Sequence, residues 1–272
     1  MNFRTIVDIP SPSFRIPPFE RMLFVGSCFA DSIGQRFADE KFRAVVNPFG
    51  VMYNPASILH SVERWLQQDD EPPCVVFLTL GTNHIYVLKE TGEIVDNCQK
   101  RPQRLFNEEV LTVDQCLNYL SETVSLLCGA CKEVRVVVTV SPIRYAKYGF
   151  HGSSLSKAVL LLAAEQLQQT FPDVVCYFPA YEIVNDELRD YRFYQPDMLH
   201  PSQQAVDYIW ERLTDSYLSD EALLFIKEWK PIKEALAHRP FHPESEEYKA
   251  FMQQTRMKAI ALEEKWGQIF SL

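Results

Sequence analysis

The sequence predicts an α/β fold in which helices cover both faces of a parallel sheet. Strand candidates alternate with helix candidates along most of the chain, and four of the five strand candidates are almost wholly apolar, for example 74–80 and 134–140. Strands that are apolar on both sides are typical of a parallel sheet buried between two helical layers. Because the crossovers between such strands are right-handed, we expect a three-layer α/β/α sandwich with five strands.

The individual elements follow from apolar runs, helical periodicity and turn residues. Residues 1–20 contain several prolines and predict an extended lead-in. The five strands are predicted at 22–25, 42–46, 74–80, 134–140 and 174–178. Helices are predicted after the first strand to about 41, at 54–68, 112–131 and 153–170, from 201 onward, and at 221–237 and 246–266.

Two segments lie outside this alternation. Residues 85–88 and 94–95, separated by a Glu-Thr-Gly-Glu turn, predict a hairpin inserted after the third strand. The C-terminal part is helical, and Pro231 is expected to kink or split the helix that contains it. We therefore expect a domain over 1–218 and a helical extension over 219–272, which packs on the domain or forms an oligomer through its apolar side chains.

Charge and composition exclude several classes of function. The 272 residues carry a formal net charge of −9, whereas a sequence-independent nucleic-acid binder needs a basic face. No apolar run approaches the roughly 18 residues of a membrane span, and the proline-rich start has no signal-peptide pattern. The seven cysteines are scattered, as is usual in a reducing compartment. We therefore expect a cytoplasmic protein.

We expect neither a metal nor another cofactor. His238 and His242 are four residues apart, but Pro240 between them prevents a regular helical pair of ligands. Cys128 and Cys131 have the spacing of a redox motif, but they end a helix instead of following a strand.

The first strand leads directly into two side chains that can act as nucleophiles. Gly26 ends the apolar run, Ser27 and Cys28 follow, and Phe29 and Ile33 begin one face of a helix. A turn of this kind lifts its side chain above the carboxyl end of the strand, where the first N–H groups of the helix can bind an oxyanion. The alternative interpretation is an ordinary turn whose small residues allow close packing.

A second candidate segment contains Asp197 and His200, in a loop before a helix. A carboxylate three residues before a histidine can hydrogen-bond the imidazole, fix its tautomer and stabilise the imidazolium form. In open α/β sheets the active site lies outside the carboxyl ends of the strands, so this loop must reach that edge to take part. If the segment is only a helix start, Ser202 is its N-cap and both side chains are solvated.

Together these motifs resemble the SGNH (GDSL-like) hydrolase superfamily. Within it, the sequence from Gly26 to Ala30 spells the motif that names the GSCFA family. Further segments resemble the family's other motifs: Asn47-Pro48-Phe49-Gly50, Asn97-Cys98-Gln99-Lys100, Ser141-Pro142 and the residues from Asp197 to Ser202. The resemblance covers residues 20–215. It implies a flavodoxin-like α/β/α fold and an ester hydrolase or acyltransferase.

The resemblance implies a role for each matching position. The superfamily's Gly-Asp-Ser register places Cys28 at the nucleophile, whereas a shift by one residue makes Ser27 the nucleophile, and both assignments stay open. His200 would be the general base and Asp197 its orienting partner.

An oxyanion hole is implied as well. Its backbone donors would be the N–H groups of Cys28 and Gly50. Its side-chain donor would be Asn83 by superfamily position, with Asn97 as the substitute candidate. Arg144 follows the fourth strand, and it is the candidate for contact with an anionic or sugar-like substrate.

Two functions of different classes follow. The first is an ester hydrolase or acyltransferase that acts on an oxygen ester, such as an O-acylated carbohydrate, through an acyl-enzyme. The second is a catalytically inactive SGNH-like module that binds a saccharide, a peptide or a partner protein. The enzyme requires the loop of Asp197 and His200 to lie at the same edge of the sheet as Ser27 and Cys28.

Overall fold

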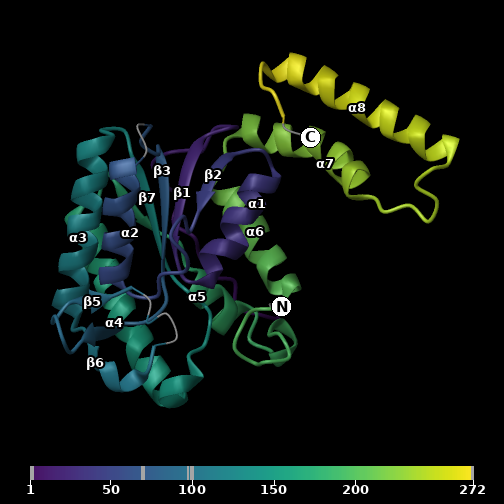
Figure 1. Ribbon diagram of the computed structural model, residues 1–272. Coiled ribbons are helices and arrows are strands. Elements are labelled where there is room, and N and C mark those ends of the chain that lie inside the picture. The colour runs from purple at the N-terminus through teal and green to yellow at the C-terminus, as the bar shows by residue number, and fades with distance from the viewer. Residues whose placement is uncertain (1–2, 69–70, 97, 99–100, 271–272) are drawn as a thin grey trace.

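A five-stranded parallel sheet lies at the centre of the molecule (Figure 1). The computed structural model describes residues 3–68, 71–96, 98 and 101–270. The sheet order is β2-β1-β3-β7-β8, which confirms the predicted fold class. The strands are β1 (Arg21–Gly26), β2 (Arg43–Val46), β3 (Val75–Leu80), β7 (Arg135–Val140) and β8 (Val175–Tyr177).

Helices cover both faces of this sheet, as predicted (Figure 1). One face carries α2, α3 and α4, and the other carries α1 and α6. In the described ranges, no helix is both long and apolar enough to cross a membrane. The helices of the sandwich are α1 (Cys28–Asp39), α2 (Pro55–Gln68), α3 (Val113–Ala130), α4 (Gly149–Thr170), the short α5 (Ala180–Glu182) and α6 (Gln203–Tyr217).

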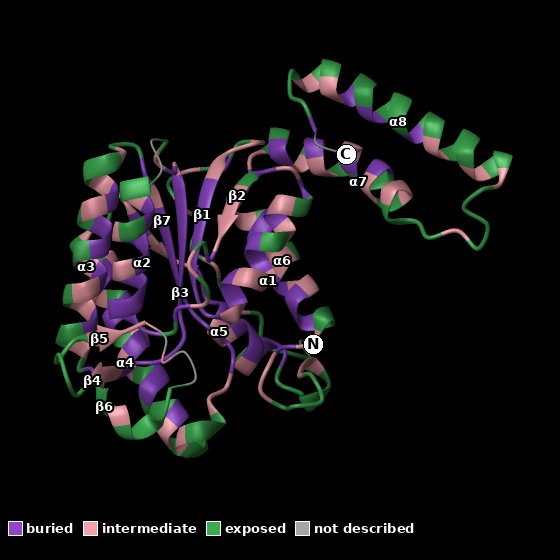
Figure 2. Cartoon of the chain, in the orientation of Figure 1, coloured by how far each residue is buried: buried purple, intermediate pink, exposed green. Residues whose placement is uncertain are grey.

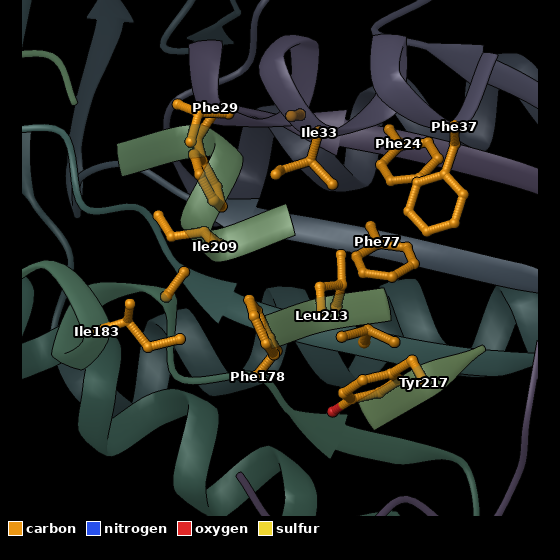
Figure 3. Packing of buried hydrophobic residues seen from close by; sticks show 14 of the residues in the cluster. Phe24, Phe29, Ile33, Phe37, Phe77, Phe178, Ile183, Ile209, Leu213 and Tyr217 are labelled. Carbon is orange, nitrogen blue, oxygen red and sulfur yellow. The ribbon is translucent and has the colours of Figure 1, made fainter. Parts of the chain in front are cut away.

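The alternation of side chains along β1 explains why the sheet is buried on both sides. Met22 and Phe24 pack in the cluster with α1 and α6, whereas Leu23 and Val25 pack in the cluster with α2, α3 and α4. All four side chains are fully buried, and each contributes about 1.5–3 kcal/mol by leaving water. Figure 3 shows the first cluster, in which the rings of Phe24 and Phe77 stack with their centroids 4.8 Å apart.

A small antiparallel sheet follows β3, in the order β5-β4-β6. Its first two strands, β4 (His84–Leu88) and β5 (Ile94–Val95), form the predicted hairpin. The third strand, β6 (Phe106–Val110), is absent from the sequence-based assignment. It escapes a search for apolar runs because four of its five residues are exposed and its centre is Asn-Glu-Glu.

The C-terminal helices α7 (Asp220–Ala237) and α8 (Glu246–Trp266) lie beside each other beyond the sandwich (Figure 1). Of the expected kink or split at Pro231, the split is wrong, because α7 runs through this residue. Proline removes one helical hydrogen bond, and the buried side chains of Trp229 and Ile232 hold the helix on both sides of it. The indole N–H of Trp229 donates to the carbonyl of Asp39, the last residue of α1, at 2.9 Å. Figure 2 shows that much of the α8 surface is exposed.

Candidate active site

A pocket of about 250 Å³ lies where β1, β3 and β7 end. It brings together the two segments that the sequence analysis pairs, because Cys28 and His200 both line it. The loop of Asp197 and His200 therefore reaches the same edge of the sheet as the turn after β1. The other lining residues include Ser27, Tyr53, Gly81, Ser141, Ile143, Arg144, Tyr145, Lys147 and Leu199.

The turn after β1 is built so that only glycine can occupy position 26. Gly26 has a φ angle of +146°, and a Cβ atom there would lie 2.2 Å from the carbonyl oxygen of Thr79. The N–H of Gly26 donates to Oδ1 of Asn47 at 2.9 Å, and the amide of Asn47 donates to Asp31 at 2.7 Å. The Asn47 segment therefore fixes both the turn and the first part of α1.

The two nucleophile candidates occupy different surroundings. Ser27 is 2% exposed, and its Oγ caps α1 by accepting from the N–H of Phe29 at 3.2 Å. The same oxygen lies 3.1 Å from Oγ1 of Thr79. Cys28 is the first residue of α1, is only half-buried, and places its Sγ 3.6 Å from the hydroxyl oxygen of Tyr53. The serine hydroxyl is thus engaged in the fold, whereas the thiol lies at the pocket.

Tyr53 is a pocket residue that the sequence analysis missed. Its carbonyl accepts from the N–H groups of Gly81 and Thr82 at 2.9 and 2.8 Å, which ties its backbone to the end of β3. Its ring meets that of Tyr145 edge to face, with centroids 5.8 Å apart. Burial, together with the contact to Cys28, raises the pKa of Tyr53 to about 12, so the hydroxyl remains a hydrogen-bond donor at neutral pH.

The loop on the other side of the pocket is held by Asp197. One oxygen of this carboxylate accepts from the N–H groups of Leu199 and His200 at 2.9 and 3.0 Å, and the other lies 2.6 Å from Nδ1 of His200. The two backbone bonds and then the imidazole lower the pKa of Asp197 to about 2. The carboxylate is therefore ionised at neutral pH, and Nε2 is the nitrogen of His200 left for chemistry.

Arg144 connects this loop to the end of β7. Its N–H donates to the carbonyl of Leu199 at 3.0 Å, and its Nη1 donates to the carbonyl of Met198 at 3.1 Å. Met198 has a φ angle of +58°, so the loop turns through the left-handed region at that point. The predicted substrate contact is thus also a structural support of the His200 loop.

Within the described residues, no hydrogen bond joins the His200 ring to Cys28 or to Ser27. Cys28 and His200 thus line a common pocket without a hydrogen bond between their side chains. Catalytic hydrogen bonds in proteins without substrate are often long, and they shorten when the substrate binds.

The predicted oxyanion donors are not all brought together. The N–H of Gly50 donates to the carbonyl of Asn47 at 2.8 Å within a turn, and Gly50 does not line the pocket. The amide of Asn83, buried elsewhere, donates to the carbonyl of Leu111 at 2.7 Å. Asn97 lies outside the described residues. Among the predicted donors that the structure describes, only the N–H of Cys28 belongs to a residue that lines the pocket.

A buried lysine, also missed from the sequence, lies beneath the pocket. Lys157 of α4 donates from Nζ to the carbonyls of Gly81 and Ser141, at 2.7 and 2.8 Å. These two residues follow β3 and β7, so the lysine joins the ends of neighbouring strands. Burial lowers the pKa of Lys157 to about 7. In the sequence, Lys157 precedes the apolar run 158–164, and this pattern predicts only a helix.

The sheet and the pocket at its carboxyl edge define a three-layer α/β/α protein with a thiol at the turn after β1. Comparison with family models then identifies the family. Residues 21–74 and 71–213 match the GSCFA family, and residues 229–270 match the C-terminal domain of GSCFA domain proteins. The chain belongs to the GSCFA family, as the resemblance implied.

Several solved structures are similar to this chain at 12% identity. A carbohydrate esterase family 3 protein from Talaromyces cellulolyticus has a TM-score of 0.41, with 76% of this chain and 99% of that chain covered. A variant of an acetyl-xylooligosaccharide esterase from Geobacillus Stearmophilus has a TM-score of 0.46, with 75% and 96% covered. A member of the lipolytic G-D-S-L family from Veillonella parvula has a TM-score of 0.45, with 71% and 96% covered. The comparison with curated proteins gave no match.

Proposed function

We propose that this protein is an ester hydrolase or acyltransferase that works through an acyl-enzyme on Cys28. The observation that carries the proposal is the pocket itself, which is lined by the Cys28 thiol and by the imidazole of the Asp197–His200 pair. Cys28 is preferred to Ser27 as the nucleophile, because the serine hydroxyl caps α1 and contacts Thr79. The positive end of the α1 dipole favours negative charge on a side chain at its first residue.

In the acylation step, His200 takes the thiol proton on Nε2 and the Cys28 sulfur attacks the carbonyl carbon of the ester. The resulting oxyanion accepts from the N–H of Cys28 and from the hydroxyl of Tyr53. The carbon–oxygen bond then breaks, and His200 returns its proton to the leaving alcohol. A thioester on Cys28 remains. Asp197 keeps the imidazole in one tautomer throughout.

In the second step, water or another alcohol attacks the thioester while His200 accepts its proton. The carbon–sulfur bond breaks, Cys28 recovers a proton from His200, and an acid or a new ester leaves. An O-acylated carbohydrate suits the pocket as a substrate, because Tyr53, Tyr145 and Arg144 offer aromatic faces and hydrogen-bond donors.

The acyl-enzyme is tested by mass spectrometry and by release of p-nitrophenol from p-nitrophenyl acetate. We expect a burst with an acetyl group on the Cys28 peptide in wild type and in Ser27→Ala, and no burst in Cys28→Ala or His200→Ala. Cys128→Ala, which removes another half-buried thiol, is the matched control and should behave as wild type. Acetylation of Ser27 in wild type would contradict this assignment and identify Ser27 as the nucleophile.

The oxyanion role of Tyr53 is tested by Tyr53→Phe. Removing one such donor lowers kcat by about 10²–10³-fold, while KM should change less than about threefold. Alkylation of Cys28 by iodoacetamide forms no oxyanion and should keep its rate. Tyr119→Phe, on α3, is the control for the substitution. Equal losses in acylation and alkylation would instead indicate that the tyrosine only positions the thiol.

The second candidate function is a catalytically inactive binding module. One observation favours it: within the described residues, the His200 ring makes no hydrogen bond to Cys28. A module of this kind would bind a saccharide, a peptide or a partner protein in the same pocket. Wild-type protein that is neither acetylated nor labelled by a fluorophosphonate, while Cys28 remains open to alkylation, would favour the module over the enzyme.

A further inference from the structure

A second cavity, of about 260 Å³, adjoins the candidate active site. The two share Arg144, which lines both. Arg144 also lines a smaller cavity of about 150 Å³ beside α4. A molecule held at Cys28 can therefore extend past this guanidinium into the second cavity. The polar residues that line the second cavity are Arg144, Asn185, Arg189, Asp190, Tyr191 and Tyr194.

The position of the Arg144 guanidinium is fixed by its neighbours. It lies over the ring of Phe150 at 4.1 Å and over that of Tyr194 at 5.4 Å, measured to the ring centroids. Its hydrogen bond to the carbonyl of Met198 uses Nη1. Because a guanidinium carries five N–H donors, several remain for a ligand.

The charge of this cavity is positive. Arg189 makes no hydrogen bond or ion pair with any other residue that the structure describes. The carboxylate in the lining, Asp190, is already engaged: one oxygen accepts from the N–H of Arg192 and the other from its guanidinium, both at 2.9 Å. This guanidinium lowers the pKa of Asp190. Two arginines therefore line the cavity, while the one carboxylate in its lining is paired with Arg192.

We propose that the cavity between Arg144 and Arg189 binds a carboxylate on the alcohol part of the ester, and that the substrate is an acylated acidic sugar. This inference rests on the proposed function. Planar guanidinium groups recognise carboxylates through paired hydrogen bonds, and arginine rather than lysine supplies both charges here. Tyr191 and Tyr194 add aromatic faces and hydroxyls suited to a sugar ring. The chain as a whole has a net charge of −9, whereas the lining of this cavity carries a net positive charge.

The test compares acetylated glucuronic acid with acetylated glucose, two substrates that differ by the carboxylate. We expect wild type to prefer the acidic ester by at least tenfold in kcat/KM at low salt, with a smaller preference at high salt. Arg189→Gln should lower kcat/KM for the acidic ester by about tenfold and leave the neutral ester within about twofold. Arg239→Gln, which changes the net charge equally at an exposed site, should keep the preference.

The outcomes separate this inference from the proposed function. Equal rates for the two esters in wild type, or equal losses for both in Arg189→Gln, would overturn the subsite. If wild type cleaves neither ester, the proposed function fails, and the subsite is decided by titration calorimetry with glucuronate and glucose. Binding of glucuronate that weakens in Arg189→Gln would then support the subsite alone, whereas absence of binding would overturn it.

Discussion

The two walls of the pocket are built in opposite ways. The turn after β1 is buried, and the sheet fixes it through Gly26, Asn47 and Thr79. The loop of Asp197 and His200 is exposed and is held mainly by hydrogen bonds within itself, with Arg144 as its link to β7. The core of the protein therefore fixes the position of the Cys28 thiol. The position of the His200 imidazole depends mainly on one carboxylate, that of Asp197.

Because of this difference, we expect substitutions at one wall to change mainly the free energy of unfolding and substitutions at the other to change mainly catalysis. Changes at the nucleophile wall should alter the free energy of unfolding, because they disturb packed or hydrogen-bonded groups. Changes at the imidazole wall should alter catalysis and leave folding nearly untouched. Four substitutions, ordered by their expected effect on stability, test this contrast.

Gly26→Ala should have the largest effect. Its Cβ would lie 2.2 Å from the carbonyl oxygen of Thr79, and φ would have to stay near +146°. We expect the free energy of unfolding in urea to fall by about 2–5 kcal/mol. Gly129→Ala is the control, because a Cβ atom there meets nothing within 4 Å and helical alanine is favoured by about 0.5–1 kcal/mol. Similar stabilities for the two variants would show that the turn tolerates a side chain.

Lys157→Met removes the two hydrogen bonds that join Gly81 and Ser141. At pH 10 we expect a loss of about 1–3 kcal/mol, because two buried carbonyls lose their donor. Burial lowers the lysine pKa from 10.5 to about 7, so between these values the unfolded chain binds a proton that the folded chain does not. Wild-type stability therefore rises with pH across this window, by up to about 1.4 kcal/mol per pH unit.

The methionine variant should lack this contribution, so the stability advantage of wild type shrinks as the pH falls from 10, closes, and reverses before pH 7. Urea unfolding of both proteins at several pH values measures this advantage. An advantage that stays constant would mean that Lys157 titrates alike in the folded and unfolded chains.

Ser27→Ala should have a smaller effect, about 1 kcal/mol, because it removes the N-cap of α1. Ser219→Ala removes the cap of α7, where Oγ accepts from the N–H of Ala222, and should cost a similar amount. Both variants should form the acyl-enzyme at the wild-type rate. Loss of acylation in the Ser27 variant alone would assign the serine a catalytic part.

Asp197→Asn should have the smallest effect on folding, a slight loss of stability, because the side chain is exposed and the amide oxygen can still accept from the N–H groups of Leu199 and His200. Acylation should nevertheless slow by about 10²-fold or more, since the amide no longer fixes the tautomer of His200. The carboxylate pKa is lowered from 3.8 to about 2, so its stabilising effect is complete above pH 4 and disappears as the pH falls through 2. The wild-type rate should therefore show no contribution from Asp197 between pH 4 and 8, which a pH–rate profile measures.

Apolar runs predicted the sheet because its central strands β1, β3 and β7 are buried on both faces, as Leu23 and Phe24 of β1 illustrate. The same criterion missed β6, whose Glu108 and Glu109 lie on an exposed strand. That Cys28 and His200 line one pocket could be predicted from topology, because sites in open α/β sheets lie at the carboxyl ends of the parallel strands.

The sequence does not reveal which hydrogen-bond partner each polar group has in the folded protein. The N–H of Gly50 is engaged within its own turn, and Asn83 hydrogen-bonds inside the fold, so neither lies at the pocket. Tyr53 belongs to no helical or strand pattern in the sequence, and Lys157 lies within an ordinary helical pattern, so neither was singled out. Hydrogen-bond partners of this kind depend on distances between elements that no pattern along the chain encodes.

The seven cysteines of the chain are all free, and the one at the start of α1 is open to solvent. If that sulfur is the reacting atom, peroxide would convert it to a sulfenic acid and stop turnover, whereas a hydroxyl at the same place would be inert. Such a catalyst depends on the reducing power of its surroundings as well as on its substrate. That dependence follows from one atom in one side chain.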